Sequence, residues 1–248
     1  MIGLQRQQLR DLGTRGYVVV PNVVPADLVA AAMQRIDGLV ADEPPPADRR
    51  GFHFYWCDEP EPDDPLLTAL TRSPAFDIAQ SLIAPRVLAV PRQVQVSLNL
   101  PPWRHRPGGP HLDGISVREP DGRPGTFTML AGILLTDQSL PDMGNLWAWP
   151  GSHELFAAHL RRAGPQALVE MEHPQMKLAP PEQITGKAGD LVLAHYLMGH
   201  NMGGNLSETV RRVVYYRLKS ETHAAEWQAC VQDPLREFAP VRQALEVG

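Results

Sequence analysis

The second half of the chain is a series of short extended segments separated by turns, and this pattern limits the possible folds more than any other feature. We expect extended segments at 126–136, 145–149, 189–196 and 211–218, and one helix at 152–163. These segments do not alternate with helices, and the sequence has neither a dinucleotide-binding glycine fingerprint nor a repeat of roughly 20 to 50 residues. The pattern excludes a doubly wound parallel sheet and favours an antiparallel barrel or sandwich.

The first part of the chain, 1–85, is predicted to be mostly helical support for this β core. Apolar spacing indicates the helical faces, and proline or glycine residues mark where the elements end. We expect a helix at 3–13, a strand at 17–20, a helix from 24 to 40, and short helices at 65–71 and 74–83.

The segment 41–65 is rich in Pro, Asp and Glu, yet it encloses the aromatic residues Phe52, Phe54, Tyr55 and Trp56. Long loops in compact domains often cover binding sites. We therefore predict a long loop that acts as a lid, with Phe54 and Trp56 lining a substrate pocket.

A further strand is expected over 86–100, where polar and apolar residues alternate through QVQVSLN. The residues Gln93, Gln95, Ser97 and Asn99 fall on one face of this strand. A polar strand face usually meets solvent, and the alternative is that it lines the interior of a polar pocket.

The length of 248 residues suits a single domain, and no linker divides it. We expect helical support and a lid loop over 1–85, a β core over 86–220 and a C-terminal extension over 221–248. Hydrophobic residues make up 43% of the chain, and no apolar run is long enough to cross a bilayer. The first residues lack the pattern of a secretory signal, so the sequence predicts a cytoplasmic protein without a membrane partner.

Charge and cysteine content narrow the possible partners and metal ligands. A net charge of -5 disfavours binding to a phosphate backbone, so we expect no nucleic-acid partner, and nothing indicates an obligate protein partner. Cys57 and Cys230 lie far apart and form no C-x-x-C, which disfavours a disulfide framework or a thiolate zinc site. Any metal would then be bound by histidine and carboxylate.

The stretch PGGPHLDGIS contains a histidine and an aspartate separated by one apolar residue. If the segment is extended, His111 and Asp113 project from the same face and could bind one metal, although a turn aspartate and a surface histidine would also fit. His200 stands where a predicted strand gives way to a Gly/Asn-rich turn, and it is the candidate third ligand, with His195 as its competitor. Two imidazoles and one carboxylate leave open metal positions, as in non-haem Fe(II) oxygenases.

Four phrases in this order give the chain a wider resemblance. They are LRDLGTRGYVVVPNVVPADLVAAAMQRIDGL near the start, the H-x-D of His111 and Asp113, GNLWAWPGSH, and GDLVLAHYLMGH followed by an Asn and an Arg-Arg pair. In these phrases the chain resembles the phytanoyl-CoA dioxygenase family. The resemblance implies a mainly β fold with flanking N-terminal helices around a double-stranded β-helix core of the jelly-roll, cupin-like kind. It also implies Fe(II), 2-oxoglutarate and O2 as metal and cosubstrates.

The same resemblance implies roles for single residues. His111, Asp113 and His200 would be the metal ligands and catalytic centre, and Arg211, eleven residues after His200, would bind the far carboxylate of 2-oxoglutarate. Its neighbour Arg212 would point to the other face of the strand.

Other positions follow the family pattern less closely. Gln95 and Asn99 have the spacing of two family residues that approach the cosubstrate. Met202 replaces a small hydroxyl residue of the family, so that contact is lost or replaced. Trp147 and Trp149 share a strand face and are core residues or part of a substrate pocket. His153 is expected to cap a helix or bond a nearby carbonyl.

These observations predict a 2-oxoglutarate-dependent dioxygenase that hydroxylates or otherwise oxidises a small organic molecule, with release of succinate and CO2. Secondary metabolism is one setting for such an enzyme. Two alternatives stay open: a non-catalytic β-barrel that binds a small molecule, and a cupin-like metal-dependent isomerase or hydrolase that does not use 2-oxoglutarate. Arg211 distinguishes the oxygenase from both alternatives, because neither alternative requires a cation at that position.

Overall fold

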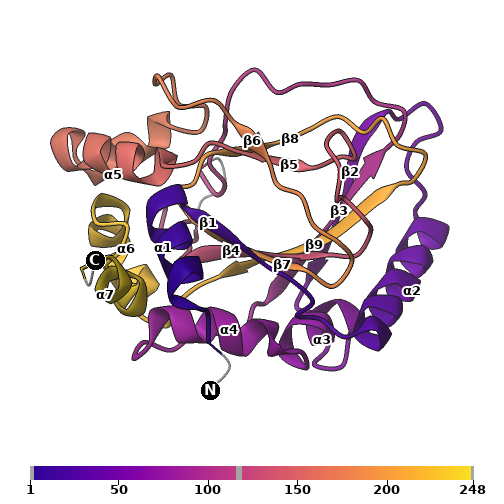
Figure 1. Ribbon diagram of the computed structural model, residues 1–248, viewed down its shortest axis with the longest axis horizontal. Coiled ribbons are helices and arrows are strands. Elements are labelled where there is room, and N and C mark those ends of the chain that lie inside the picture. Colours follow the sequence, from indigo (N-terminus) through magenta and orange to yellow (C-terminus); the bar gives the residue numbers. More distant parts are fainter. Residues whose placement is uncertain (1–2, 116–118, 247–248) are drawn as a thin grey trace.

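Two antiparallel sheets form the core of the protein in the computed structural model, which describes residues 3–115 and 119–246 (Figure 1). The larger sheet has the strand order β1-β7-β4-β9-β3-β2, and the smaller sheet has the order β6-β5-β8. This is the jelly-roll architecture expected from the sequence. The strands are β1 (Tyr17–Val20), β2 (Gly51–Asp58), β3 (Gln93–Leu100), β4 (Met129–Leu134), β5 (Leu146–Ala148), β6 (Glu182–Gln183), β7 (Leu191–His195), β8 (His200–Met202) and β9 (Arg211–Leu218).

Helices flank the larger sheet and the end of the core, and a 3-10 helix, η1 (Pro165–Glu170), follows α5. Proline at the first helical position and a preceding capping side chain explain why two short helices begin where they do: Asp64 accepts a hydrogen bond from Leu66 N, and Ser73 accepts one from Ala75 N. Within the described residues, no helix is both long and apolar enough to span a membrane. The helices are α1 (Arg6–Arg15), α2 (Ala26–Asp42), α3 (Pro65–Thr71), α4 (Pro74–Ile83), α5 (Ser152–Ala163), α6 (His223–Gln232) and α7 (Ala239–Glu246).

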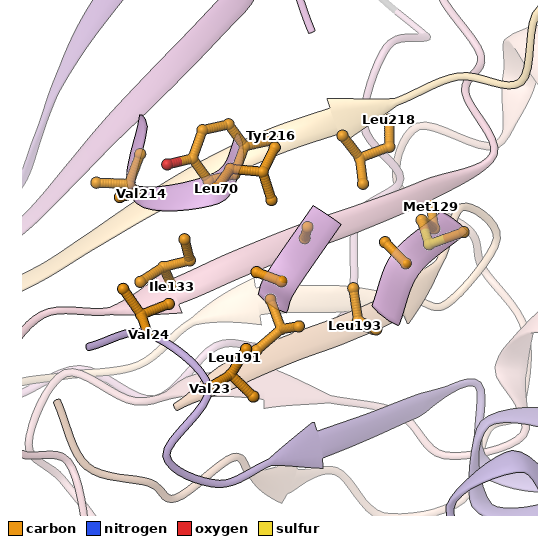
Figure 2. Close-up of a cluster of buried hydrophobic side chains, with 14 of the residues drawn as sticks. Val23, Val24, Leu70, Met129, Ile133, Leu191, Leu193, Val214, Tyr216 and Leu218 are labelled. Atoms are coloured by element: carbon orange, nitrogen blue, oxygen red, sulfur yellow. The ribbon is translucent and has the colours of Figure 1, made fainter. Parts of the chain in front are cut away.

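The larger sheet buries apolar side chains on both of its faces. On one face, residues of β4, β7 and β9 pack against α2, α3 and α4, and Figure 2 shows Ile133, Leu191, Val214 and Tyr216 in this cluster. On the other face, Val213 and Tyr215 of β9 belong to a second cluster together with residues of α5. Successive β9 side chains therefore alternate between the helical layer and the space between the two sheets.

The prediction of a long loop over 41–65 is wrong in its centre, because 51–58 form strand β2. This strand pairs with β3 along its whole length, from Gly51 opposite Leu100 to Asp58 opposite Gln93. It is the last strand of its sheet, and Phe52 and Trp56 remain 36% and 47% exposed. The aromatic cluster is thus part of the sheet edge. The preceding helix α2 also runs two residues further than predicted, to Asp42.

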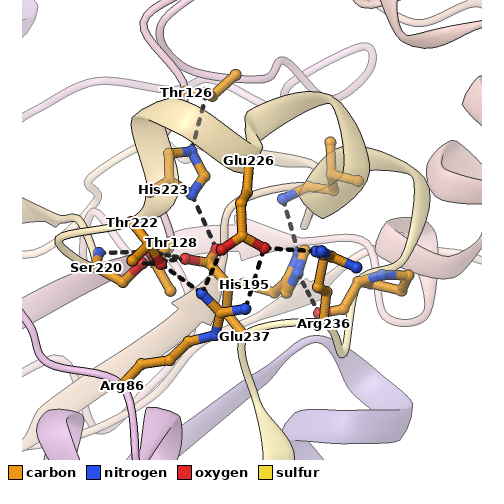
Figure 3. A network of polar contacts seen from close by, with 12 residues as sticks. Arg86, Thr126, Thr128, His195, Ser220, Thr222, His223, Glu226, Arg236 and Glu237 are labelled. Carbon is orange, nitrogen blue, oxygen red and sulfur yellow. Dashed lines mark hydrogen bonds and ion pairs between the residues drawn. The ribbon is translucent and has the colours of Figure 1, made fainter.

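The C-terminal extension folds back onto the β core through a buried polar network (Figure 3). His223 Nδ1 lies 2.9 Å from Glu237 Oε2, and its Nε2 lies 2.9 Å from Thr126 Oγ1. The other oxygen of Glu237 accepts hydrogen bonds from Thr128, at 3.0 Å, and from Ser220. These contacts anchor the chain around α6 and α7 to the segments that flank β4 and β9.

Candidate metal centre

Three side chains from two distant parts of the chain, the segment 111–113 and the start of β8, meet in the structure. Asp113 Oδ1 lies 3.3 Å from His111 Nε2 and 3.6 Å from His200 Nε2. One potential ligand atom from each residue lies within 4.8 Å of the others. The structure therefore brings together the three residues that the sequence singled out.

Backbone pairing sets this arrangement. His111 and His200 form an isolated antiparallel bridge, with N–O distances of 2.9 and 3.2 Å, and the next residue but one, Asp113, completes the group. His200 also begins β8, which pairs with β5. The Nδ1 atom of His200 is 3.1 Å from Met198 O, and this contact directs its Nε2 toward Asp113.

The electrostatics of the group favour an ionised carboxylate. Burial opposes ionisation of Asp113, but hydrogen bonds with His111 and His200 and the charge of Arg217 hold its pKa well below the usual range. Burial and the neighbouring His200 lower the pKa of His111. At His200 burial also acts to lower the pKa, but the hydrogen bond and charge of Asp113, together with the Met198 carbonyl, outweigh it and raise the pKa. A carboxylate oxygen and two imidazole nitrogens that face one another are a donor set suited to a divalent transition metal.

A small cavity of about 60 Å³ joins these three residues to Arg211. It also contains two residues predicted from the sequence, Gln95 and Phe54, and Met202. The described residues that line it are Phe54, Gln95, Ser97, His111, Asp113, Leu130, Leu146, His200, Met202, Arg211 and Tyr215. A side-chain carboxylate, two imidazoles and a guanidinium thus share one enclosed space.

Arg211 is only 3% exposed, and three side chains hold its guanidinium. Its Nε donates to Gln138 Oε1 at 3.2 Å, Nη1 to Ser97 Oγ at 3.2 Å, and Nη2 to the Tyr215 hydroxyl at 2.6 Å. Gly144 lies close by, because a Cβ at this position would be 3.0 Å from the Cβ of Arg211. The glycine of the GNLWAWPGSH phrase therefore leaves room for the arginine stem.

A larger cavity of about 570 Å³ also borders the histidine and aspartate. His111 and Asp113 line it together with Trp56 of β2 and Arg217 of β9. The sequence predicted that Phe54 and Trp56 line a substrate pocket. In the structure Phe54 lines the small cavity and Trp56 lines the larger one.

The remaining predicted residues lie elsewhere. Leu146 lines the small cavity, and neither Trp147 nor Trp149 lines either of these two cavities, because the β5 face that points inward carries Leu146. Trp149 is 6% exposed and lines a separate cavity of about 690 Å³ together with Pro110 and Asn201, whereas Trp147 packs against Gly203. Asn99 is fully buried and donates to Gly203 O at 2.7 Å, so its amide contacts the backbone behind the small cavity.

The competing histidines have other partners. His195 Nε2 lies 2.9 Å from Pro234 O and its Nδ1 accepts from Leu197 N, so both ring nitrogens are occupied away from Asp113. His153 Nε2 lies 3.1 Å from Gly13 O, which is the carbonyl contact expected from the sequence. Arg212 points away from the cavity and pairs with Asp37 of α2 at 2.6 Å.

The sequence left open whether the polar face of β3 meets solvent or lines a pocket, and the structure answers this. Gln95, Ser97 and Asn99 are all less than 9% exposed, so this face lines the interior, and only Gln93 is exposed. Tyr215 and Arg217 were not singled out from the sequence. Alternation along β9 was the signal that could have found them, because both fall on the face of Arg211.

Comparison with known proteins places these observations in a family. The family model of phytanoyl-CoA dioxygenase (PhyH) matches residues 13–213. A comparison with curated protein sequences finds no match.

Three solved structures illustrate the shared fold. HygX from Streptomyces hygroscopicus, with nickel and 2-oxoglutarate bound, is 18% identical, with 88% of each chain covered and a TM-score of 0.57. EctD from S. alaskensis, with 2-oxoglutarate and 5-hydroxyectoine, is 20% identical over 87% of this chain and 76% of that chain, with a TM-score of 0.59. The epimerase SnoN, in complex with Fe3+, alpha ketoglutarate and nogalamycin RO, is 18% identical over 87% and 83% of the chains, with a TM-score of 0.58.

At these identities the structural similarity shows a common fold, whereas the family model covers most of the sequence itself. The chain therefore belongs to the phytanoyl-CoA dioxygenase family, and it is a 2-oxoglutarate-dependent non-haem iron oxygenase by type.

Proposed function

We propose that His111, Asp113 and His200 bind Fe(II), that Arg211 binds 2-oxoglutarate, and that the protein oxidises a small organic molecule. The observation that supports this most is the single cavity that contains the three metal-site residues and Arg211. A non-catalytic barrel or a cupin-like isomerase does not require a buried guanidinium in the same cavity as the metal site.

Arg211 is suited to a carboxylate because of the donors it has left. A guanidinium carries five N–H groups, and the three side-chain contacts of Arg211 use one each on Nε, Nη1 and Nη2. One N–H on each terminal nitrogen stays free. These two donors can meet the two oxygens of one carboxylate side by side, which is the bidentate geometry that arginine favours.

Iron and 2-oxoglutarate, once bound, supply the oxidising chemistry, in which O2 is consumed and 2-oxoglutarate is converted to succinate and CO2. The protein's own residues orient these partners and keep water away. Ser97, Gln138 and Tyr215 hold the plane of the guanidinium, and Gln95 is available to contact the cosubstrate from β3.

The substrate occupies the larger cavity in this proposal, because that cavity shares His111 and Asp113 with the small cavity that contains Arg211. Its volume of about 570 Å³ falls within the usual range for small-molecule sites. Trp56 supplies an apolar wall of this cavity, and Phe54 lines the adjoining small cavity. HygX was solved with hygromycin B, and SnoN comes from nogalamycin biosynthesis. These neighbours support secondary metabolism as the setting.

Succinate formation tests this function directly. We expect the pure protein, given Fe(II), ascorbate and 2-oxoglutarate, to form succinate slowly without added substrate, and His111→Ala to abolish this activity. His173→Ala is the matched control, because His173 is exposed and its ring centroid lies 6.5 Å from that of His111. No succinate from the unmodified protein, or equal rates from it and His111→Ala, would reject the proposal.

A further inference from the structure

The two oxygens of Asp113 have different partners. Oδ1 faces both imidazoles, at 3.3 Å from His111 Nε2 and 3.6 Å from His200 Nε2. Oδ2 accepts a hydrogen bond from Arg217 Nη2 at 2.6 Å. The carboxylate therefore presents one oxygen to the metal site, while the other is bound by a cation from β9.

Arg217 is itself confined on both sides. Its guanidinium carbon lies 4.9 Å from the ring centroid of Trp56 and 5.9 Å from that of Phe127. Its side chain is 22% exposed, compared with 14% for Asp113. Contacts of this kind with aromatic faces favour a planar guanidinium over a flexible ammonium. The Arg217 fork thus has little freedom to leave Oδ2.

We propose that Arg217 is a positioning residue of the metal centre: it occupies Oδ2 of Asp113, so that the carboxylate binds the metal through Oδ1 alone. This inference rests on the proposed function. A free carboxylate can bind a metal with either one or two oxygens. A second oxygen from Asp113 would fill a position that 2-oxoglutarate or O2 needs, so Arg217 keeps that position available.

A simpler role would be charge compensation, in which Arg217 only offsets the buried negative charge of Asp113. The two roles predict different behaviour of a lysine variant. Arg217→Lys keeps the positive charge but loses the planar group that packs between Trp56 and Phe127. If position matters, both Arg217→Lys and Arg217→Gln alter the metal centre. If charge alone matters, Arg217→Lys behaves as the unmodified protein does.

The control is available on the same strand. Arg212 also pairs with an aspartate at 2.6 Å, Asp37, but it lies on the opposite face of β9, away from both cavities. Arg212→Gln therefore removes an equally short ion pair from the same strand without touching Asp113.

Two binding measurements without turnover test the inference. The first is the visible absorption of Co(II) bound in place of iron, which weakens as more atoms coordinate the metal. The second is an anaerobic titration of the Fe(II)-loaded protein with 2-oxoglutarate, followed by their joint visible absorption. We expect both Arg217 variants to show weaker Co(II) absorption and roughly 10- to 100-fold weaker 2-oxoglutarate binding, with Arg212→Gln unchanged. Thermal unfolding confirms that each variant is folded, and if Arg217→Gln does not fold, the lysine variant decides.

Wild-type Co(II) absorption and 2-oxoglutarate affinity in Arg217→Gln would overturn the inference, and so would wild-type behaviour of Arg217→Lys. Failure of the proposed function has a different signature. In that case the unmodified protein itself would bind no Co(II) and give no absorption with Fe(II) and 2-oxoglutarate.

Discussion

Replacing Arg211 with alanine should weaken 2-oxoglutarate binding by one to three orders of magnitude. The substitution removes two donors to the far carboxylate, and charge-assisted contacts of this kind are together worth roughly 2 to 4 kcal/mol. Since about 1.4 kcal/mol corresponds to a tenfold change in affinity, the dissociation constant should rise between roughly thirtyfold and a thousandfold. The variant should also be less stable by roughly 1 to 3 kcal/mol, because Ser97, Gln138 and Tyr215 lose a buried partner.

The assay is the anaerobic titration of Fe(II)-loaded protein with 2-oxoglutarate, together with urea unfolding of each variant. Arg212→Ala is the control: its partner Asp37 is 64% exposed, so this ion pair should be worth less than about 1 kcal/mol, and cosubstrate binding should not change. A severe binding defect in Arg212→Ala with a mild one in Arg211→Ala would mean that the inward face of β9 has been assigned wrongly.

Three further predictions concern other histidines and the C-terminal network. His200→Ala should abolish the visible absorption that Fe(II) and 2-oxoglutarate give together, whereas His195→Ala should keep it, and the reverse result would make His195 the ligand. Burial lowers the pKa of His153 to about 4 and that of His195 to about 3, from 6.5 in the unfolded chain. As pH drops below about 6.5, the unfolded state therefore binds protons before the folded state does, and the free energy of unfolding should fall. Urea unfolding between about pH 7.5 and 5 checks this, and His195→Gln should make the slope shallower; an unchanged slope would contradict it. Burial acts to raise the pKa of Glu237, but the hydrogen bond and charge of His223, with the hydrogen bonds from Ser220 and Thr128, outweigh it and lower the pKa. Glu237→Gln should therefore lose roughly 3 kcal/mol or more at neutral pH, and the difference from the unmodified protein should shrink as pH falls below 4.5; equal stability at neutral pH would argue against the network.

Local signals in the sequence predicted the elements whose ends they mark. Proline after a capping residue located α3 and α4, and a β-branched and aromatic run located β9, all with the bounds seen in the structure. The grouping of His111, Asp113 and His200 was also predicted, because the H-x-D spacing and the histidine at the strand end are local patterns that the family resemblance joins.

Features that depend on tertiary packing were not predictable in the same way. Strand β2 alternates aromatic residues with other apolar or aromatic ones, so it lacks the polar and apolar contrast of a half-buried strand, and its flanks are rich in proline and acidic residues. The inward face of β5 depends on how this three-residue strand pairs with β8, which placed Leu146 and not Trp147 in the cavity. The partner of Arg217 follows from the meeting of distant segments, which no spacing indicates.

Strand β9 imposes a constraint on how such an enzyme can change. Arg211 and Arg217 occupy the same face because they lie six positions apart in the strand, so inserting or deleting one residue between them would turn one of the two away from the core. Length changes in β9 are therefore not a route to a new substrate range. Edge strand β2 has one strand neighbour and contributes Trp56 to the larger cavity, so it is the more accessible place for change, provided that Trp56 is kept against the Arg217 guanidinium. Libraries aimed at new substrates should vary β2 at positions other than Trp56 and leave the register of β9 intact.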